Sequence, residues 1–253
     1  LAWIDRHLLG RDVEENEAID EDSPLAHALL KAEAARAGGL LGQMVYRTPG
    51  DADDAVLAPE MAELAALPGV KVGRFEVTRA QFAEYDSTYA YDEGTGNWPA
   101  SGISFEQAQG YCEWLSEATG RNFRLPTVQE MEKLVKAASS NASRENNLDY
   151  WAGYTLTPDE VPMVMEKIAK QEKHGTLLKE CGSFPPVGGA DEGPKGKKSS
   201  AIWDLAGNVA EWAVTEDGEG KVMGLSAINP RDKRCEYNPP PTKYTGFRIY
   251  GEK

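Results

Sequence analysis

The chain has 253 residues, of which 41% are hydrophobic, and a formal net charge of −14. This length and composition fit one large domain, or a domain with an extension, with enough apolar residues to form a core. The acidic charge argues against nucleic acid and anionic membrane surfaces as partners, and no run approaches the roughly eighteen apolar residues of a membrane span. No basic and apolar leader opens the chain, so no targeting signal is expected and the compartment stays open.

Residues 1–42 are predicted to form a helical lead outside the main domain. An acidic run, "DVEENEAIDED", is followed by "SPLAHALLKAEAARAGG". The second stretch has a serine cap, proline at the first helical position and a Gly-Gly stop, which together are typical of a helix. The main domain is then expected over residues 43–253.

Three helix starts of one kind follow. "TRAQ" (Thr78–Gln81), "SFEQ" (Ser104–Gln107) and "TVQE" (Thr127–Glu130) each place Ser or Thr three residues before Gln or Glu, which is the capping-box pattern. Apolar residues at helical spacing follow the last two caps, so two amphipathic helices are predicted. The alternating stretch "VKVGRFEVT" (70–78) predicts a strand that leads into a short helix at the first cap.

Regular patterns weaken from residue 139 onward. We expect a polar loop at "SSNASRENN" (139–147), a helix at "VPMVMEKIAKQEKHG" (161–175) and a loop at "PPVGGADEGPKGKKSS" (185–200). The C-terminal quarter has many glycine, proline and aromatic residues and little helical pattern. The expected fold class is α+β, with two main helices, short strands and much ordered loop.

Neither the cysteines nor the histidines form a recognisable site. Cys112, Cys181 and Cys235 are far apart and odd in number, so no disulfide framework is expected. The three histidines are isolated from one another. They indicate neither a metal-binding motif nor a Ser-His-Asp arrangement.

These segments together resemble one family. "GRFEVTRAQFAEY", "CEWLSEATGRNFRLPT", "AIWDLAGNVAEW" and the terminal "GFRIY" occur in the order and spacing of the sulfatase-modifying-factor domain, the domain of the formylglycine-generating enzymes. "QMVYRTPG" resembles its usual opening, so the resemblance covers residues 43–253. It implies a C-type-lectin-like fold of the formylglycine-generating-enzyme subclass, with two helices, small twisted sheets and long loops.

The stretch "DLAGNVAEW" (204–212) has two interpretations. In the family that it resembles, the matching turn can hold calcium, and hard oxygen donors of this kind suit that ion. The implied ligands are two side chains and two carbonyls, from Asp204, Glu211, Gly207 and Val209. The alternative is a structural turn in which Asp204 and Asn208 bond backbone amides and Trp212 packs in the core. Calcium is therefore possible, and no cofactor is required.

The catalytic cysteines of the family are absent. Formylglycine-generating enzymes use two cysteines, five residues apart, to bind copper and oxidise a substrate cysteine with dioxygen. Alignment of "GLSAINPRDKRCEY" on Ser226 places Asn229 and Arg234 at those positions, and Cys235 is one residue away. Because the thiolate is the reactive and metal-binding form, the resemblance predicts no such enzyme activity here. A divergent oxidase that pairs Cys235 with Cys181 remains the main alternative.

The chain resembles another branch of this fold better, the variable proteins of diversity-generating retroelements. These display a hypervariable ligand-binding segment that ends with "GFR", which here is 225–245, "LSAINPRDKRCEYNPPPTKYT". Mutagenic copying of adenines in Asn codons cannot produce Lys, Glu, Gln, Met or Trp, so Lys233, Glu236 and Lys243 would be fixed. The expected ligand-binding positions are Ala227, Ile228, Asn229, Arg231, Asp232, Arg234, Tyr237, Asn238 and Tyr244.

The implied function is non-catalytic binding of an unknown protein or cell-surface ligand. Exposed aromatic and arginine side chains on an ordered loop suit this role, because such residues carry most of the binding energy of interfaces. The nine positions are expected to lie exposed on one face, and Gly246, Phe247 and Arg248 are expected to be buried or paired in a closing strand. A phage or cell-surface interaction module without a variable segment remains a further alternative.

Overall fold

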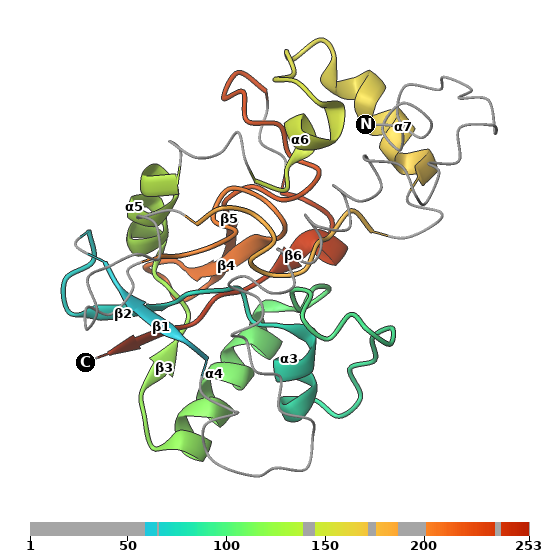
Figure 1. The fold of residues 1–253 in the computed structure, drawn as a ribbon. Coiled ribbons are helices and arrows are strands. Elements are labelled where there is room, and N and C mark those ends of the chain that lie inside the picture. The colour runs from blue at the N-terminus through green and yellow to red at the C-terminus, as the bar shows by residue number, and fades with distance from the viewer. Residues whose placement is uncertain are drawn as a thin grey trace, which may run out of the picture. The chain divides into compact units, whose positions relative to one another are not determined.

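The computed structural model of the chain describes residues 59–64, 66–138, 145–171, 176–186, 201–235 and 239–252. They belong to one compact unit, Leu57–Lys253 (Figure 1). The expected helical lead over 1–42 and its boundary at residue 43 lie outside the described residues. Within the described ranges, no helix is long and apolar enough to cross a membrane.

All three capping boxes begin helices, as the sequence predicts. Thr78 and Ser104 accept hydrogen bonds from the backbone amides of Gln81 and Gln107, and both glutamines reach back to the cap amides. At the third start, the Glu130 carboxylate accepts from the amide of Thr127 at 2.8 Å. The helices of the described chain are α3 (Arg79–Tyr85), α4 (Phe105–Thr119), α5 (Val128–Ala138), α6 (Leu148–Ala152) and α7 (Val161–Gln171).

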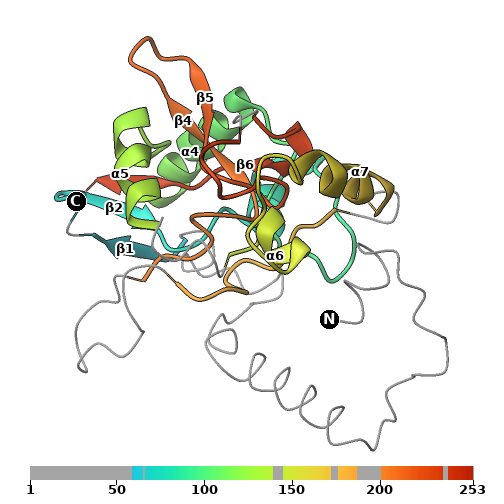
Figure 2. The same cartoon turned by 90° about the horizontal axis from the view of Figure 1, so that it is seen from above.

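The strands form two small sheets. One has the order β1-β2-β7-β3 with antiparallel neighbours, and the other has the order β5-β4-β6, in which β4 and β5 are antiparallel and β4 and β6 are parallel. Figure 2 shows β4 and β5 as a hairpin beside α5. The strands are β1 (Met61–Glu63), β2 (Val70–Gly73), β3 (Phe123–Arg124), β4 (Ala210–Val214), β5 (Gly220–Met223), β6 (Thr245–Gly246) and β7 (Tyr250–Glu252). The α+β expectation is confirmed.

Two local predictions need correction. The strand expected over 70–78 ends at Gly73, because the chain bends at Arg74 and Phe75, just after a last bond in the register of β1 and β2, from the Arg74 amide to the Glu60 carbonyl. The expected polar loop over 139–147 ends in buried residues, Glu145 to Asn147, and Asn147 caps α6, a helix that the sequence pattern did not predict. Both departures bring polar side chains into the interior.

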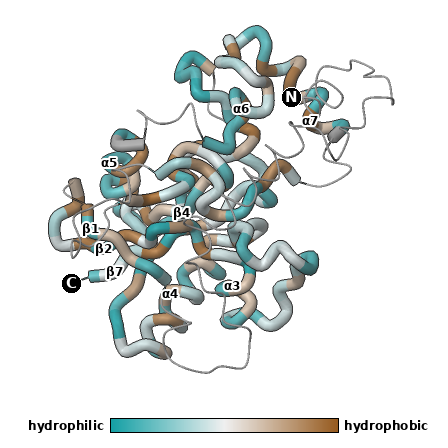
Figure 3. Tube along the Cα trace, viewed as in Figure 1, coloured by the Kyte–Doolittle hydropathy of each residue, from teal (hydrophilic) through white to brown (hydrophobic). Residues whose placement is uncertain are grey.

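The apolar faces of the two main helices form the core. Hydrophobic and hydrophilic residues alternate along these helices (Figure 3). α5 contributes Met131 and Leu134 to a cluster that also contains Val72, Ile202 and Tyr250. α4 lies against α3 and the C-terminal segment in a second cluster, which contains Phe82, Ile103, Tyr111, Leu115, Phe123 and Phe247. The two clusters leave a polar centre between the sheets and the 204–209 turn.

Candidate functional site

The turn before β4 is held by its own side chains. Asp204 and Asn208 have left-handed backbones, with φ of 58° and 66°, which Asn and Asp tolerate better than most residues. The Asn208 amide donates to Glu76 at 2.8 Å and to the carbonyl of Lys179 at 3.1 Å. Its oxygen accepts from the Asn146 side chain and the Lys179 amide, each at 2.9 Å. All the hydrogen-bonding capacity of this buried amide is therefore used by the protein.

Glu76 is the buried carboxylate that accepts hydrogen bonds from this turn. It comes from the bend after β2, and its two oxygens accept from the Val209 amide at 3.1 Å and from the Asn208 side chain at 2.8 Å. The Cys181 sulfur lies 3.5 Å from the second oxygen. Burial raises the pKa of Glu76 well above its usual value, and the negative charges of Asp204 and Glu211 raise it further.

Arg248 is the buried cation of the centre. Its Nε lies 3.2 and 3.3 Å from the two oxygens of Glu211, and its Nη2 donates to one of them at 2.9 Å. The remaining donors reach the carbonyls of Gly73 and Trp203, at 2.9 and 2.8 Å. Burial alone would lower the pKa of this guanidinium, but the carboxylates of Glu211 and Glu76 raise it. Arg248 thus joins both sheets, and the expected burial of Gly246, Phe247 and Arg248 is confirmed.

Two further buried carboxylates are incompletely bonded. Asp204 accepts from the Gly182 amide at 2.6 Å through Oδ2, and its Oδ1 has no hydrogen-bond partner within the described residues. Among the described residues, neither carboxylate oxygen of Glu145 has a hydrogen-bond partner. Burial raises the pKa of Asp204 to about 6 and that of Glu145 to about 9. Buried carboxyls that lack partners hold their protons because the charged form is poorly solvated.

The stability of the protein should decrease as pH rises through neutrality, and Glu145 should be one cause. An unfolded glutamate titrates near 4.5, whereas the folded pKa of Glu145 is about 9. Between these values the unfolded chain has lost a proton that the folded chain keeps, so the free energy of unfolding falls as pH rises. In thermal melts with chelator from about pH 5 to about pH 8.5, Glu145→Gln should show a smaller decline of Tm than the wild type.

The exposed Glu113 provides the control for this measurement. Glu113→Gln removes a carboxylate from the α4 surface and should keep the wild-type decline. Equal declines in all three proteins would contradict the assignment to Glu145.

Both side chains of the predicted calcium set are engaged by protein groups. Glu211 is paired with Arg248, and one oxygen of Asp204 is bound by the Gly182 amide. The amide of Val209 donates to Glu76, and Gly207 packs against the backbone of Asn146. A calcium ion on all four residues would have to compete with the guanidinium for Glu211. The bonding of Asp204 and Asn208 to backbone amides matches the structural interpretation, and calcium stays a prediction.

The expectation that the nine ligand-binding positions are exposed is wrong for four of them. Ala227 and Tyr244 are completely buried, and Ile228 and Asn229 are 7% and 8% exposed. Asn229 closes its own loop by accepting from the amide and hydroxyl of Ser226, and the Tyr244 hydroxyl accepts from the Leu177 amide. Arg231 and Asp232 are half-buried, Arg234 is exposed, and Tyr237 and Asn238 lie outside the described residues. The front of the segment is therefore core, because its apolar residues pack inward.

A cavity of about 690 Å³ lies between α5 and the 224–235 segment. Three of the expected ligand-binding residues line it: Asn229, Arg231 and Asp232. Its other walls include Lys136 from α5, Met223 from β5, and Leu205, Ala206 and Cys235. The Nε of Arg231 is buried and has no hydrogen-bond partner among the described residues. Apolar walls and a few polar groups of this kind are typical of ligand sites.

The three cysteines are free and occupy separate environments. Cys112 is buried in α4, where burial raises its pKa to about 12. Cys181 is buried against Glu76, and burial raises its pKa well above the usual value. Cys235 lies on the cavity instead. Cys112 therefore packs in the core as a small apolar side chain.

Sequence reasoning did not single out Glu76 or Glu145 as site residues, and it named Cys181 only as the partner of Cys235 in the oxidase alternative. Glu76 stands between two apolar residues in an alternating stretch, which indicates a solvent-facing side chain. Glu145 belongs to a run of polar residues that is typical of a loop. Their burial results from contacts with distant segments, which no local pattern records.

Comparison with known proteins agrees with the resemblance seen in the sequence. Residues 39–238 match the family model of the sulfatase-modifying factor enzyme 1-like domain. Similar solved structures include PvdO from Pseudomonas aeruginosa, with 16% identity over 73% of this chain and 80% of that chain, at a TM-score of 0.45. The variable protein 1 of Treponema denticola has 17% identity over 73% and 84%, at 0.42. CarF has 18% identity over 73% and 86%, at 0.38.

A comparison with curated proteins finds no match. The family model covers most of the chain, including both main helices, the 204–212 turn and most of the 225–245 segment. The chain therefore belongs to the sulfatase-modifying-factor family, the family of the formylglycine-generating-enzyme-like domains.

Proposed function

We propose that the chain is a non-catalytic ligand-binding protein whose ligand enters the cavity between α5 and the 224–235 segment. The observation that carries this proposal is the lining of that cavity. It combines the half-buried Arg231 and Asp232 with apolar side chains from β5 and the turn. As in the variable proteins that the sequence resembles, the C-terminal segment supplies the specific contacts.

The polar groups of the cavity favour a ligand with an apolar body and an acceptor such as a carboxylate. Arg231, Lys136 and Lys233 line the space, together with the acidic Glu132 and Asp232. Asp232 is paired with Arg234, whose hydrogen bonds lower the pKa of Asp232 to about 2. A half-buried guanidinium such as that of Arg231 recognises carboxylates strongly. Arg231 is therefore the main anchor of the proposed site.

Peptides selected from a random phage-displayed library on the immobilised full chain provide a direct test. Those that bind the wild type should bind Arg231→Ala at least about tenfold more weakly, because a hydrogen bond to a charged group contributes about 1.5–3 kcal/mol. The exposed Arg121, which is not in the lining, supplies the matched control Arg121→Ala. Affinities are measured by interferometry on variants with unchanged circular dichroism. Equal binding to all three proteins, or no enriched peptide, would oppose the proposal.

Diversification of the segment is tested at the DNA level. We expect a near-copy of the DNA that encodes residues 225–248 beside a reverse-transcriptase gene. Its absence would remove the variable role and leave an interaction module without diversification.

The protein should not oxidise thiols with copper. Asn229 and Arg234 stand where the enzymes of the family carry cysteines, Cys181 is completely buried, and Cys235 lies apart on the cavity. Incubation of the chain with Cu(I), dioxygen and a cysteine-containing peptide should leave the peptide mass unchanged. Multiple turnovers to an aldehyde product, lost in Cys235→Ser, would instead support the oxidase alternative.

A further inference from the structure

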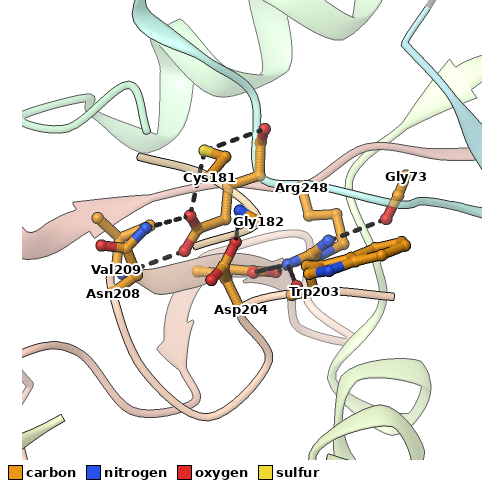
Figure 4. A network of polar contacts seen from close by, with 10 residues as sticks. Gly73, Cys181, Gly182, Trp203, Asp204, Asn208, Val209 and Arg248 are labelled. Atoms are coloured by element: carbon orange, nitrogen blue, oxygen red, sulfur yellow. Dashed lines mark hydrogen bonds and ion pairs between the residues drawn. The ribbon is translucent and has the colours of Figure 1, made fainter. Parts of the chain in front are cut away.

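Three side chains from separate segments converge in the polar centre. Glu76 comes from the bend after β2, Cys181 from the 176–186 segment and Asp204 from the turn before β4. One donor atom of each lies within 4.8 Å of the other two, and all three residues are buried. Figure 4 shows Cys181, Asp204 and Val209 around this common interior. We propose that Glu76, Cys181 and Asp204 form a binding site for a zinc-like divalent metal ion, independently of the ligand-binding cavity.

The separation of the donor atoms suits a single ion. Zinc bonds to sulfur at about 2.3 Å and to carboxylate oxygen at about 2.0–2.2 Å, so two ligands of one ion lie at most about 4.5 Å apart. The three donors already approach this spacing. The Cys181 sulfur lies 3.5 Å from one oxygen of Glu76, a separation that two ligands of one zinc ion can have.

The centre also has acceptor capacity that the protein leaves unused. Asp204 is 1% exposed, and its Oδ1 has no hydrogen-bond partner in the described part of the chain. The neighbouring Glu145 is completely buried with both oxygens in the same condition. An unsatisfied buried polar group is costly, so such groups require an explanation, and a bound ion is one.

The distribution of charge also favours a bound metal ion. Glu76, Glu145, Asp204 and Glu211 are four buried carboxyls, and the hydrogen bonds of Arg248 to carboxylates go to Glu211. A divalent ion beside the first three would offset their negative charge. Binding replaces the Cys181 proton, which leaves to water as the Zn–S bond forms, and any carboxyl proton follows the same route without oxidation or reduction.

The donor types select zinc over calcium. Calcium takes six to eight oxygen ligands, whereas a thiolate with two carboxylates suits zinc and similar transition metals. The surrounding protein orients the carboxylates: the Val209 amide and Asn208 hold Glu76, and the Gly182 amide holds Asp204. Such outer contacts are typical of metal sites. The ion would differ from the calcium predicted in the turn both in its chemistry and in its use of Cys181.

Cobalt incorporation tests the site. The full chain is produced without an affinity tag in cobalt-supplemented medium, and the metal content and the near-ultraviolet absorption are measured. We expect about one cobalt per chain and a thiolate-to-cobalt charge-transfer band. Cys181→Ser should abolish the band and lower the metal content at least about tenfold, whereas Cys235→Ser should keep both.

Asp204→Asn provides a second variant in case Cys181→Ser does not fold. It retains an oxygen for the Gly182 amide, and its folded state is checked by circular dichroism; the metal content should again fall at least about tenfold. A wild-type chain that is metal-free after growth in zinc or cobalt would overturn the proposal. A thiolate-to-cobalt band that persists in Cys181→Ser would also overturn it. So would cobalt bound without any thiolate band, because the ion would then be held by oxygen ligands such as those predicted for calcium in the turn.

Discussion

Replacing Arg248 with methionine should lower the free energy of unfolding by about 3–5 kcal/mol, because it strands a buried carboxylate. Arg248 and Glu211 are 0% and 3% exposed in their side chains, and the same guanidinium bonds two backbone carbonyls. Domains of this kind are stable by only about 5–15 kcal/mol, so the loss is a large fraction of the total. Urea unfolding followed by tryptophan fluorescence measures it.

The pair of Arg124 with Glu130 is the matched control. It is also a bidentate contact, at 2.7 Å for both bonds, but its side chains are 31% and 15% exposed. Arg124→Met should cost only about 0–1 kcal/mol, because water compensates the loss. Adding Glu211→Met to Arg248→Met should recover stability, since the stranded charge disappears. If Arg248→Met and Arg124→Met lower the free energy of unfolding by the same amount, burial of the Arg248–Glu211 pair does not increase its contribution to stability.

Gly207→Ala should destabilise the protein by about 3 kcal/mol or more, because the turn has no room for a methyl group. A Cβ at this position would lie 2.3 Å from the carbonyl oxygen of Asn146 and 2.6 Å from its carbon. The Asn146 carbonyl accepts a hydrogen bond from the backbone N–H of Asn208 at 2.6 Å. These backbone atoms therefore cannot move aside without loss of that bond. Thermal and urea unfolding provide the measurement.

Gly96 offers the comparison, since a Cβ there would lie no closer than 3.4 Å to its neighbours. Gly96→Ala should therefore change the free energy of unfolding by only about 0.5 kcal/mol. If Gly207→Ala is as stable as Gly96→Ala, the 204–209 turn can rearrange to accommodate a methyl group. The polar centre would then not be rigid.

The family and the absence of its cysteine pair follow from motifs that can be read along the chain. "DLAGNVAEW" and "GFRIY" are short and specific, and the loss of cysteine at Asn229 and Arg234 needs only an alignment of one segment. The exposure of the nine positions expected to bind a ligand was less predictable. The rule for permitted residues describes codons, and it contains no information on whether Ala227 or Tyr244 faces the core.

The sequence by itself determined the three helix starts, the two amphipathic helices and the burial of the Gly246–Arg248 segment. Caps and helical faces depend on residues three or four positions apart, so local spacing is sufficient to define them. The tertiary structure alone decided that Glu76, Cys181 and Asp204 meet, and that Tyr244 turns inward to the Leu177 amide. Those residues are separated by tens of positions, and only the packing of the two sheets against the 204–209 turn brings them together, because burial of polar groups depends on partners that distant segments supply.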